Sequence, residues 1–300
     1  MNINEYADMT NEEFTAARSG KKPAAARPFA TARLSTTKLS SLPDRLDWRE
    51  TEGVVTETKN QGGCGSCWAF SATESLESMY AIATNSTAPK LSTQQMVSCS
   101  PNPDHCGGSG GCDGSTQELG YNYTQQVGLS LEKDYPYEGR TGTCETSKIS
   151  AAVKHTGYEM LPMNNYTSLI TAVHEKGPIA ISIAAGGLGW QLYGGGIYDD
   201  KHCGFVQDHG VGLVGYGSDT VGVFKKTKED YWLVRNSWGK GWGEKGYIRI
   251  QRFGEGKEPC GMDKQPQDGS ACTGDTKPVK YCGLCAILSD SSYPTGVSKA

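Results

Sequence analysis

The sequence has no run approaching the roughly 18 consecutive apolar residues that a membrane-spanning helix requires. Its first residues, Met1 to Tyr6, are polar and lack the apolar core of a secretory signal peptide. It also has no basic stripe, and its 29 Lys and Arg residues are balanced by 33 Asp and Glu residues. The 300-residue chain is therefore expected to bind neither membrane nor nucleic acid.

Cysteine, by contrast, is abundant, with 11 residues of this type. This usage is typical of a protein that folds in an oxidising compartment. If one cysteine stays free, the ten that remain are enough for five disulfides. Glycosylation sequons at Asn85, Asn122 and Asn165 agree with export. We therefore expect a lysosomal, vacuolar or extracellular protein, although no signal peptide is seen in this chain.

A loop of small residues, 61–66, leads into Cys67, after which apolar residues recur every three or four positions. This period predicts a helix that packs on one face and begins at Cys67. Because a helix N-terminus stabilises an anion, we expect this thiol to ionise more readily than a free cysteine and to act as a nucleophile. The alternative is that Cys67, like Cys64, is half of a disulfide.

A nucleophilic cysteine needs a base, and the base needs a group that orients it. His209 lies in Gln-Asp-His-Gly-Val-Gly, and Asn236 lies in Arg-Asn-Ser-Trp-Gly-Lys-Gly-Trp-Gly. Together with Gln-Gly-Gly-Cys-Gly-Ser-Cys-Trp around Cys67, these segments resemble the papain-like cysteine peptidases, most closely the cathepsin L type. The resemblance runs from about Leu42 to the C-terminus.

This resemblance implies an α+β fold of two lobes, with the active site in the cleft between them. We expect a peptidase over 42–300, with a helical half over about 52–150 and a β-barrel-like half over about 151–300. The strand-like patterns in the second half agree with this division.

Residues 1–41 are expected to precede the mature enzyme. Residues 4–14 resemble the end of a papain-family propeptide, which in the family covers the cleft until it is removed. Thr10 to Glu13 reads as a helix capping box, and residues 21–41 have the composition of a linker. The resemblance thus implies a truncated propeptide on a monomeric enzyme. Its partners would be peptide or protein substrates, this propeptide and cystatin-like inhibitors.

The resemblance also assigns roles to the residues of the cleft. Cys67 attacks as a thiolate, and His209 holds and then delivers the proton. Asn236 orients the imidazole while Trp238 shields that hydrogen bond from water, and Gln61 donates to the oxyanion. The expected substrate-binding residues are Gly114, Ser115, Thr116, Gln117, Ser182, Gly210 and Trp238. Small walls at two of them, Ser182 and Gly210, predict room for Leu, Phe or Val as the second residue upstream of the cleaved bond.

Two disulfides carry over from the family, Cys64–Cys112 and Cys99–Cys144, and Cys203 is expected to join Cys260 or Cys282. Two stretches exceed the family pattern: a polar, hairpin-like insertion at 218–230 and a segment at 254–285 with four cysteines, Cys260, Cys272, Cys282 and Cys285. A small zinc site is the alternative for these four. Their irregular spacing and the oxidising setting favour disulfides, so we predict no metal and no cofactor.

We therefore expect a cysteine endopeptidase made as a zymogen. Nothing near His105 resembles the paired histidines of the family's carboxydipeptidases, which favours cleavage within chains. The alternative, from another class, is a catalytically silent relative that serves as a binding or storage protein. The presence of Cys67, His209, Asn236 and Gln61 together argues against it.

Overall fold

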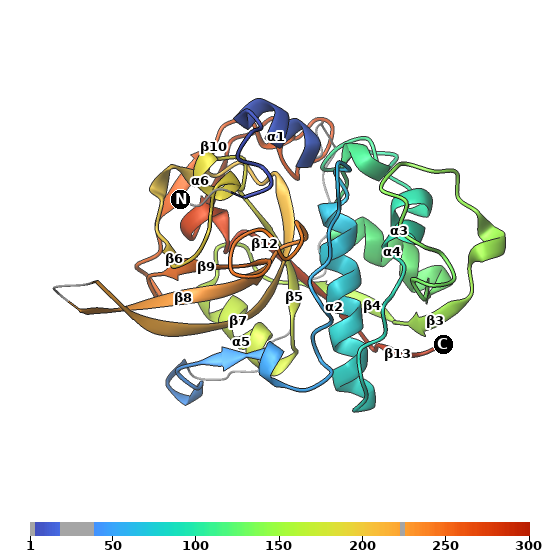
Figure 1. Cartoon of the computed structure of the whole chain (residues 1–300), viewed down its shortest axis with the longest axis horizontal. Coiled ribbons are helices and arrows are strands. Elements are labelled where there is room, and N and C mark those ends of the chain that lie inside the picture. The colour runs from blue at the N-terminus through green and yellow to red at the C-terminus, as the bar shows by residue number, and fades with distance from the viewer. Residues whose placement is uncertain (1–3, 19–38, 223–225) are drawn as a thin grey trace.

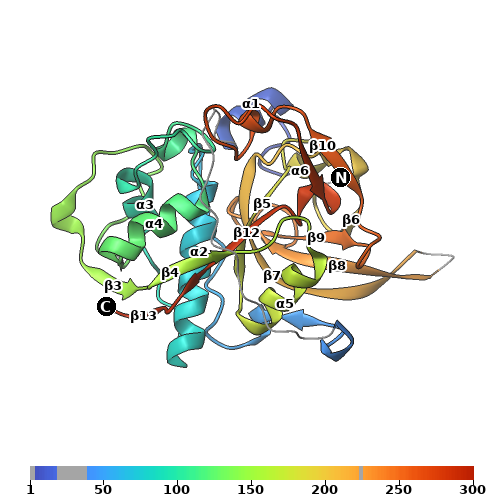
Figure 2. The same cartoon turned by 180° about the vertical axis from the view of Figure 1, so that it is seen from behind.

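The computed structural model describes residues 4–18, 39–222 and 226–300, which form two halves that lie side by side. The helical half lies on the right in Figure 1 and the large sheet on the left; Figure 2 shows the same arrangement from behind. Most of the linker predicted for 21–41 falls outside the described residues. Within them, no helix is long and apolar enough to cross a membrane.

The long helix α2 (Cys67–Thr84) runs along the boundary between the halves (Figure 1). The helix predicted after Cys67 is confirmed, but the expectation that it packs on one face is wrong. Every residue from Cys67 to Met79 is buried, because both halves pack against the helix. Its polar residues therefore need partners inside the protein, as Glu77 has in Lys59, 2.6 Å away.

Two shorter helices and a small sheet complete the helical half. Ser92 caps the first helix by accepting a hydrogen bond from the backbone N–H of Gln95, which is the usual role of serine at this position. The elements are α3 (Thr93–Cys99), α4 (Gln117–Val127), β2 (Leu129–Ser130), β3 (Ala151–Lys154) and β13 (Ser298–Lys299).

The other half is built on an eight-stranded sheet in the order β4-β12-β5-β7-β8-β9-β6, with β1 paired to β7. All of its described pairs are antiparallel except β6 with β9. The strands are β1 (Leu46–Asp47), β4 (Gly157–Met160), β5 (Ile179–Ile183), β6 (Ile197–Tyr198), β7 (His209–Val221), β8 (Thr227–Arg235), β9 (Tyr247–Arg252) and β12 (Asp290–Thr295).

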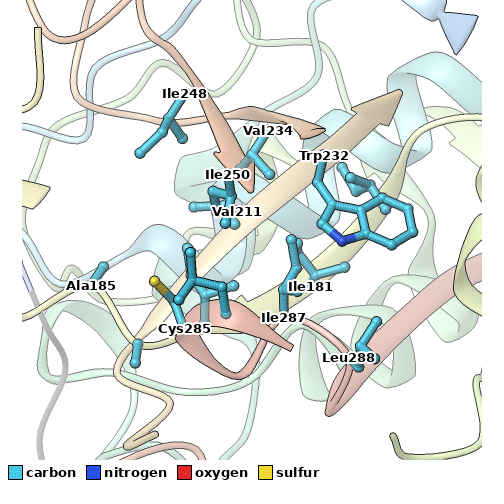
Figure 3. Close-up of a cluster of buried hydrophobic side chains, with 14 of the residues drawn as sticks. Ile181, Ala185, Val211, Trp232, Val234, Ile248, Ile250, Cys285, Ile287 and Leu288 are labelled. Carbon is cyan, nitrogen blue, oxygen red and sulfur yellow. The ribbon is translucent and has the colours of Figure 1, made fainter. Parts of the chain in front are cut away.

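Apolar side chains of this sheet pack into one large core (Figure 3). Trp232, Ile181 and Ile250 are completely buried there, among aliphatic residues of β5, β7, β8 and β9. The helices α5 (Tyr166–Glu175) and α6 (Leu188–Gln191) belong to this half, and α1 (Asn11–Arg18) lies above it, next to α6. This core fixes the start of β7, at His209, relative to the end of β8, which Asn236 follows.

The polar insertion predicted at 218–230 extends the β7–β8 hairpin, with Asp219 opposite Glu229 and Val221 opposite Thr227. Its tip, residues 223–225, lies outside the described residues. The second insertion contains another hairpin, β10 (Cys260–Asp263) with β11 (Val279–Cys282).

Ten of the cysteines form five disulfides. Cys64–Cys112 and Cys99–Cys144 are present as the resemblance implied. The partner expected for Cys203 was wrong, since it bonds Cys285. Cys260 and Cys282 lie opposite each other in the β10–β11 hairpin and bond to one another, so neither is left for Cys203. The fifth disulfide, Cys106–Cys272, was not assigned from the sequence.

Candidate active site

Cys67 is the cysteine outside these bridges and the first residue of α2, so the alternative that it forms a disulfide with another part of the chain is excluded. The thiol is buried, and burial raises its pKa to about 11. Hydrogen bonds from the backbone of Gly210 and Trp68 lower the pKa in part. Loss of solvent raises the pKa of the thiol by more than these backbone groups lower it. The helix N-terminus alone therefore does not produce the easy ionisation expected from the sequence.

The start of β7 lies directly on the first turn of α2. A Cβ atom on Gly210 would lie 3.1 Å from both the backbone N and the Cα of Trp68. This close approach places His209, the neighbour of Gly210, in the lining of the same pocket as Cys67. Glycine at 210 thus has a packing role, since a side chain would push the strand away from the helix.

His209 and Asn236 are joined by a hydrogen bond of 2.8 Å between Nε2 and Oδ1. Twenty-seven residues separate them in sequence, yet the β7–β8 pairing brings their strand ends together, with Gly212 opposite Arg235. Both side chains are buried. An amide oxygen accepts, so the proton on His209 Nε2 points to Asn236, and Nδ1 is the nitrogen available for chemistry with the thiol.

Trp238 packs against the histidine, with 4.7 Å between ring centroids. Phe14 covers the indole from another side at 4.9 Å, and Tyr6 donates its hydroxyl to the carbonyl of Trp238 at 2.8 Å. Gln191 fixes the same segment by donating from Nε2 to the carbonyls of Tyr6 and Met9. The residues before the linker therefore lie over the Trp238 side of the site.

The capping box predicted at the start of α1 is confirmed. The Glu13 carboxylate accepts from the backbone N–H of Thr10 at 2.9 Å, and the Thr10 hydroxyl accepts from the N–H of Glu13 at 3.2 Å. The backbone N–H and the hydroxyl of Thr10 both donate to the Glu13 carboxylate and hold its pKa below the usual value.

Gln61 is fully buried and begins the loop that leads to Cys67. Its backbone N–H donates to the carbonyl of Ser237 at 2.8 Å, and its Oε1 accepts from the Ser237 hydroxyl at 2.7 Å. Its Nε2 donates to the carbonyl of Cys64 at 2.9 Å. An amide nitrogen carries two protons, so this arrangement fixes the amide beside the loop that leads to Cys67.

A narrow pocket opens at Cys67 and His209. Of the residues expected to bind substrate, it is lined by five, namely Gly114, Ser115, Gln117, Ser182 and Gly210. Thr116 and Trp238 do not line it. The methyl group of Thr116 faces the loop at Gly107, and Trp238 is buried behind His209.

The lining of this pocket is more polar than expected. The Ser182 hydroxyl donates to Asp290 at 2.7 Å, and Gln117 Nε2 lies 3.2 Å from the same hydroxyl. The space beside Gly210 is taken by α2. The predicted preference for a hydrophobic residue therefore gains no support from this pocket and stays a prediction.

Other lining residues were missed from the sequence: Gly107, Gln207, Asp208, Gly269 and Ser270. The two that neighbour His209 could have been found from their position next to it. Gly269 and Ser270 come from the insertion at 254–285 and Gly107 from a loop of the helical half, and no pattern in either indicates contact with the cleft. No group of three or more His, Cys, Asp or Glu residues in the described ranges is arranged to hold a metal ion.

The fold has two halves, and a buried free thiol at a helix start shares a pocket with a histidine that is oriented by an asparagine. This arrangement is typical of a thiol-dependent hydrolase. Comparison with known proteins names the family: the pattern of the papain family cysteine proteases matches residues 42–269, and the chain belongs to this family.

Three relatives show how far the similarity extends. Vignain of Ricinus communis is 37% identical over 301 residues, which is 98% of this chain and 73% of vignain. Oryzain beta chain of Oryza sativa subsp. japonica is 41% identical over 254 residues, 84% of this chain and 51% of that protein, so the chain spans about half of its length. The crystal structure of the proform of the ragweed pollen allergen Amb a 11, a cysteine protease, superposes with a TM-score of 0.75 at 35% identity, covering 98% of this chain and 80% of that one.

Proposed function

We propose that this protein is a cysteine endopeptidase that hydrolyses peptide bonds through an acyl-enzyme. The observation that carries the proposal is the free thiol of Cys67 in one pocket with His209, whose Nε2 is bound to Asn236. The sulfur attacks the peptide carbonyl carbon, the C–N bond breaks, and the departing amine takes a proton from His209. Water, deprotonated by the same imidazole, then releases the acid.

The thiolate is formed by proton transfer to His209. A thiol whose pKa is about 11 would be almost entirely protonated at neutral pH. A neighbouring imidazolium is an opposite charge inside a buried site, where it favours the thiolate strongly. Asn236 keeps the imidazole in the tautomer and plane that this pair needs, because its oxygen binds the proton on Nε2.

Gln61 supplies one donor to the oxyanion, next to the backbone N–H of Cys67. Ser237 and Cys64 hold its amide group before the reaction begins. Such prearranged donors stabilise the transition state without having to reorganise. Gly114 and Ser115 are assigned to the extended substrate backbone upstream of the cleaved bond, since both line the pocket.

Residues 4–18 are assigned to an inhibitory pro-segment. Tyr6 and Phe14 cover Trp238, and the side chain of Asn11 donates to the carbonyl of Gly186, 3.0 Å away. A substrate residue downstream of the cleaved bond would have to displace these contacts. Removal of the segment is then the activating step of the zymogen.

The five disulfides support an oxidising destination, which we assign to the lysosome, the vacuole or the extracellular space. Asn85, Asn122 and Asn165 are exposed, as glycosylation would require.

The test uses the protein after removal of residues 1–41, with Cys67→Ala as the matched inactive variant. Incubation with a fluorogenic Phe-Arg peptide at about pH 5 should give turnover that the variant lacks, and an epoxysuccinyl inhibitor should label Cys67. No turnover and no labelling would support the silent binding or storage protein instead.

A further inference from the structure

Residues 264–278, here called the strap, connect β10 to β11. Their two ends are held together by the β10–β11 hairpin and by Cys260–Cys282. In Figures 1 and 2 this orange to red segment passes over the top of the molecule, beside α1, toward the loops above α3. The match to the papain family pattern ends at residue 269, within the strap, so its second part lies beyond the family pattern.

The strap is attached to the β half through Gln207, two residues before His209. The Ser270 hydroxyl donates to Gln207 Oε1 at 3.2 Å. The backbone of Gly269 packs so closely that a Cβ atom there would lie 2.7 Å from the carbonyl oxygen of Gln207. Only a residue without a side chain fits at this point of the strap.

The strap is attached to the helical half as well. Cys272 is bonded to Cys106, 166 residues away, and both sulfurs are buried. Two backbone hydrogen bonds flank this disulfide: the N–H of Gly107 donates to the carbonyl of Ala271 at 3.1 Å, and the N–H of Thr273 donates to the carbonyl of Asp104 at 3.2 Å. The strap therefore bridges the two halves across the cleft.

The bridge crosses at one particular side of the active site. Gly269 and Ser270 line the same pocket as Cys67 and His209. Gly107, bound to the strap, packs against Ser115, where a Cβ atom would lie 2.5 Å from the Ser115 carbonyl oxygen. Under the proposed function, this is the side that receives the substrate residues upstream of the cleaved bond.

We propose that the strap determines substrate specificity by limiting how many residues a substrate has upstream of the cleaved bond. Gly269 and Ser270 line the same pocket as Cys67, so an extended peptide, which advances about 3.3 Å per residue, meets the strap within roughly two residues of the cleaved bond. A third upstream residue must displace the strap, which Cys106–Cys272 prevents. The proposed endopeptidase is thereby restricted to bonds close to the amino terminus of its substrates, with no such limit downstream. This inference rests on the proposed function.

The test compares fluorogenic peptides with two, three, four and five residues upstream of the cleaved bond, all with the same two residues next to it and with free amino termini. We expect kcat/KM of the activated enzyme to fall at least about tenfold between two and four upstream residues. In the double variant Cys106→Ser/Cys272→Ser the strap is untied, and the four peptides should be cleaved at rates within about threefold of one another.

The matched control is Cys99→Ser/Cys144→Ser, which removes a disulfide of the helical half that does not touch the strap. This variant should keep the length preference of the wild type. A second variant, in which residues 264–278 are replaced by Asn-Gly, keeps the β10–β11 hairpin and should lose the preference even if the double cysteine variant fails to fold.

The inference is overturned if the wild type cleaves all four peptides equally well, or if the preference survives both in the double cysteine variant and in the shortened strap. Failure of the proposed function looks different: no peptide is cleaved by any variant and Cys67 is not labelled by the epoxysuccinyl inhibitor.

Discussion

At the scale of single residues, Gln61 is the group whose contribution to catalysis is most directly separable. Replacing it by Ala removes one donor to the oxyanion, so kcat should fall by about 10²- to 10³-fold. Ser237→Ala is the matched control, because it deletes the hydroxyl that holds Gln61 Oε1 and leaves the amide donor present. If kcat falls no further in Gln61→Ala than in Ser237→Ala, Gln61 does not donate to the oxyanion. Thermal unfolding of both variants checks that the fold is kept.

A second residue-scale prediction concerns Glu74, which is buried and lies 3.2 Å from Arg235. Burial raises the pKa of its carboxyl to about 7, and Arg235 offsets this only in part. The ordinary value is 4.5, so between pH 4.5 and 7 the folded state binds more protons than the unfolded state. The free energy of unfolding should fall by up to about 3 kcal/mol as the pH rises through this window.

Denaturant unfolding of Glu74→Gln at several pH values tests this, since the slope should become smaller by the contribution of Glu74. Glu258, whose pKa burial also raises to about 7, keeps its own contribution in this variant. The control is Glu57→Gln. The pKa of the exposed Glu57 is lowered to about 2 by hydrogen bonds to Lys90 and Lys240. Its protonation therefore changes the free energy of unfolding only below this pH window. An unchanged slope between pH 4.5 and 7 in Glu74→Gln would show that another group causes it.

At the scale of secondary-structure elements, the contact of β7 with α2 sets the distance between the two reacting side chains. Gly210→Ala places a methyl group 3.1 Å from the Trp68 backbone, so β7 must move away. We expect a loss of at least about tenfold in kcat/KM, because small displacements of catalytic groups are costly. Gly212→Ala is the control, since its Cβ would meet no atom closer than 3.7 Å. Equal activity of both variants would contradict this account.

The pro-segment acts as an element too, through α1 and the residues before it. Phe14→Ala removes the ring that covers Trp238 and should cost the docked segment on the order of 3 kcal/mol. In the uncleaved protein, labelling of Cys67 by an epoxysuccinyl inhibitor should then be at least tenfold faster than in the wild type. Glu12→Ala, at an exposed position of α1, should leave the rate unchanged. An equal rate in Phe14→Ala would mean that α1 does not restrict the site.

At the scale of the whole molecule, sequence reasoning succeeded where a local pattern decides structure and failed where distant segments meet. The period after Cys67 located α2, and Thr10 with Glu13 located the start of α1. The same period did not reveal that α2 is buried on all sides, because that depends on the second half packing against it.

The disulfides of the second insertion could not be predicted from the sequence for the same reason. Cys260 and Cys282 meet because a hairpin forms, and Cys106 meets Cys272 because the strap crosses the cleft. Neither event leaves a periodic signal. The raised pKa of Cys67 also reflects the assembled halves, since a helix N-terminus considered alone predicts the opposite direction.

The whole account depends on a thiol from one half being ionised by an imidazole from the other. The direct measurement is the rate at which iodoacetamide alkylates Cys67 as a function of pH, in the activated wild type and in His209→Asn. The wild type should react rapidly from about pH 5 upward, because the imidazolium stabilises the thiolate. In His209→Asn, burial alone should set the pKa of the thiol, so the alkylation rate should rise only as the pH approaches about 11. Superimposable profiles for the two proteins would contradict the account.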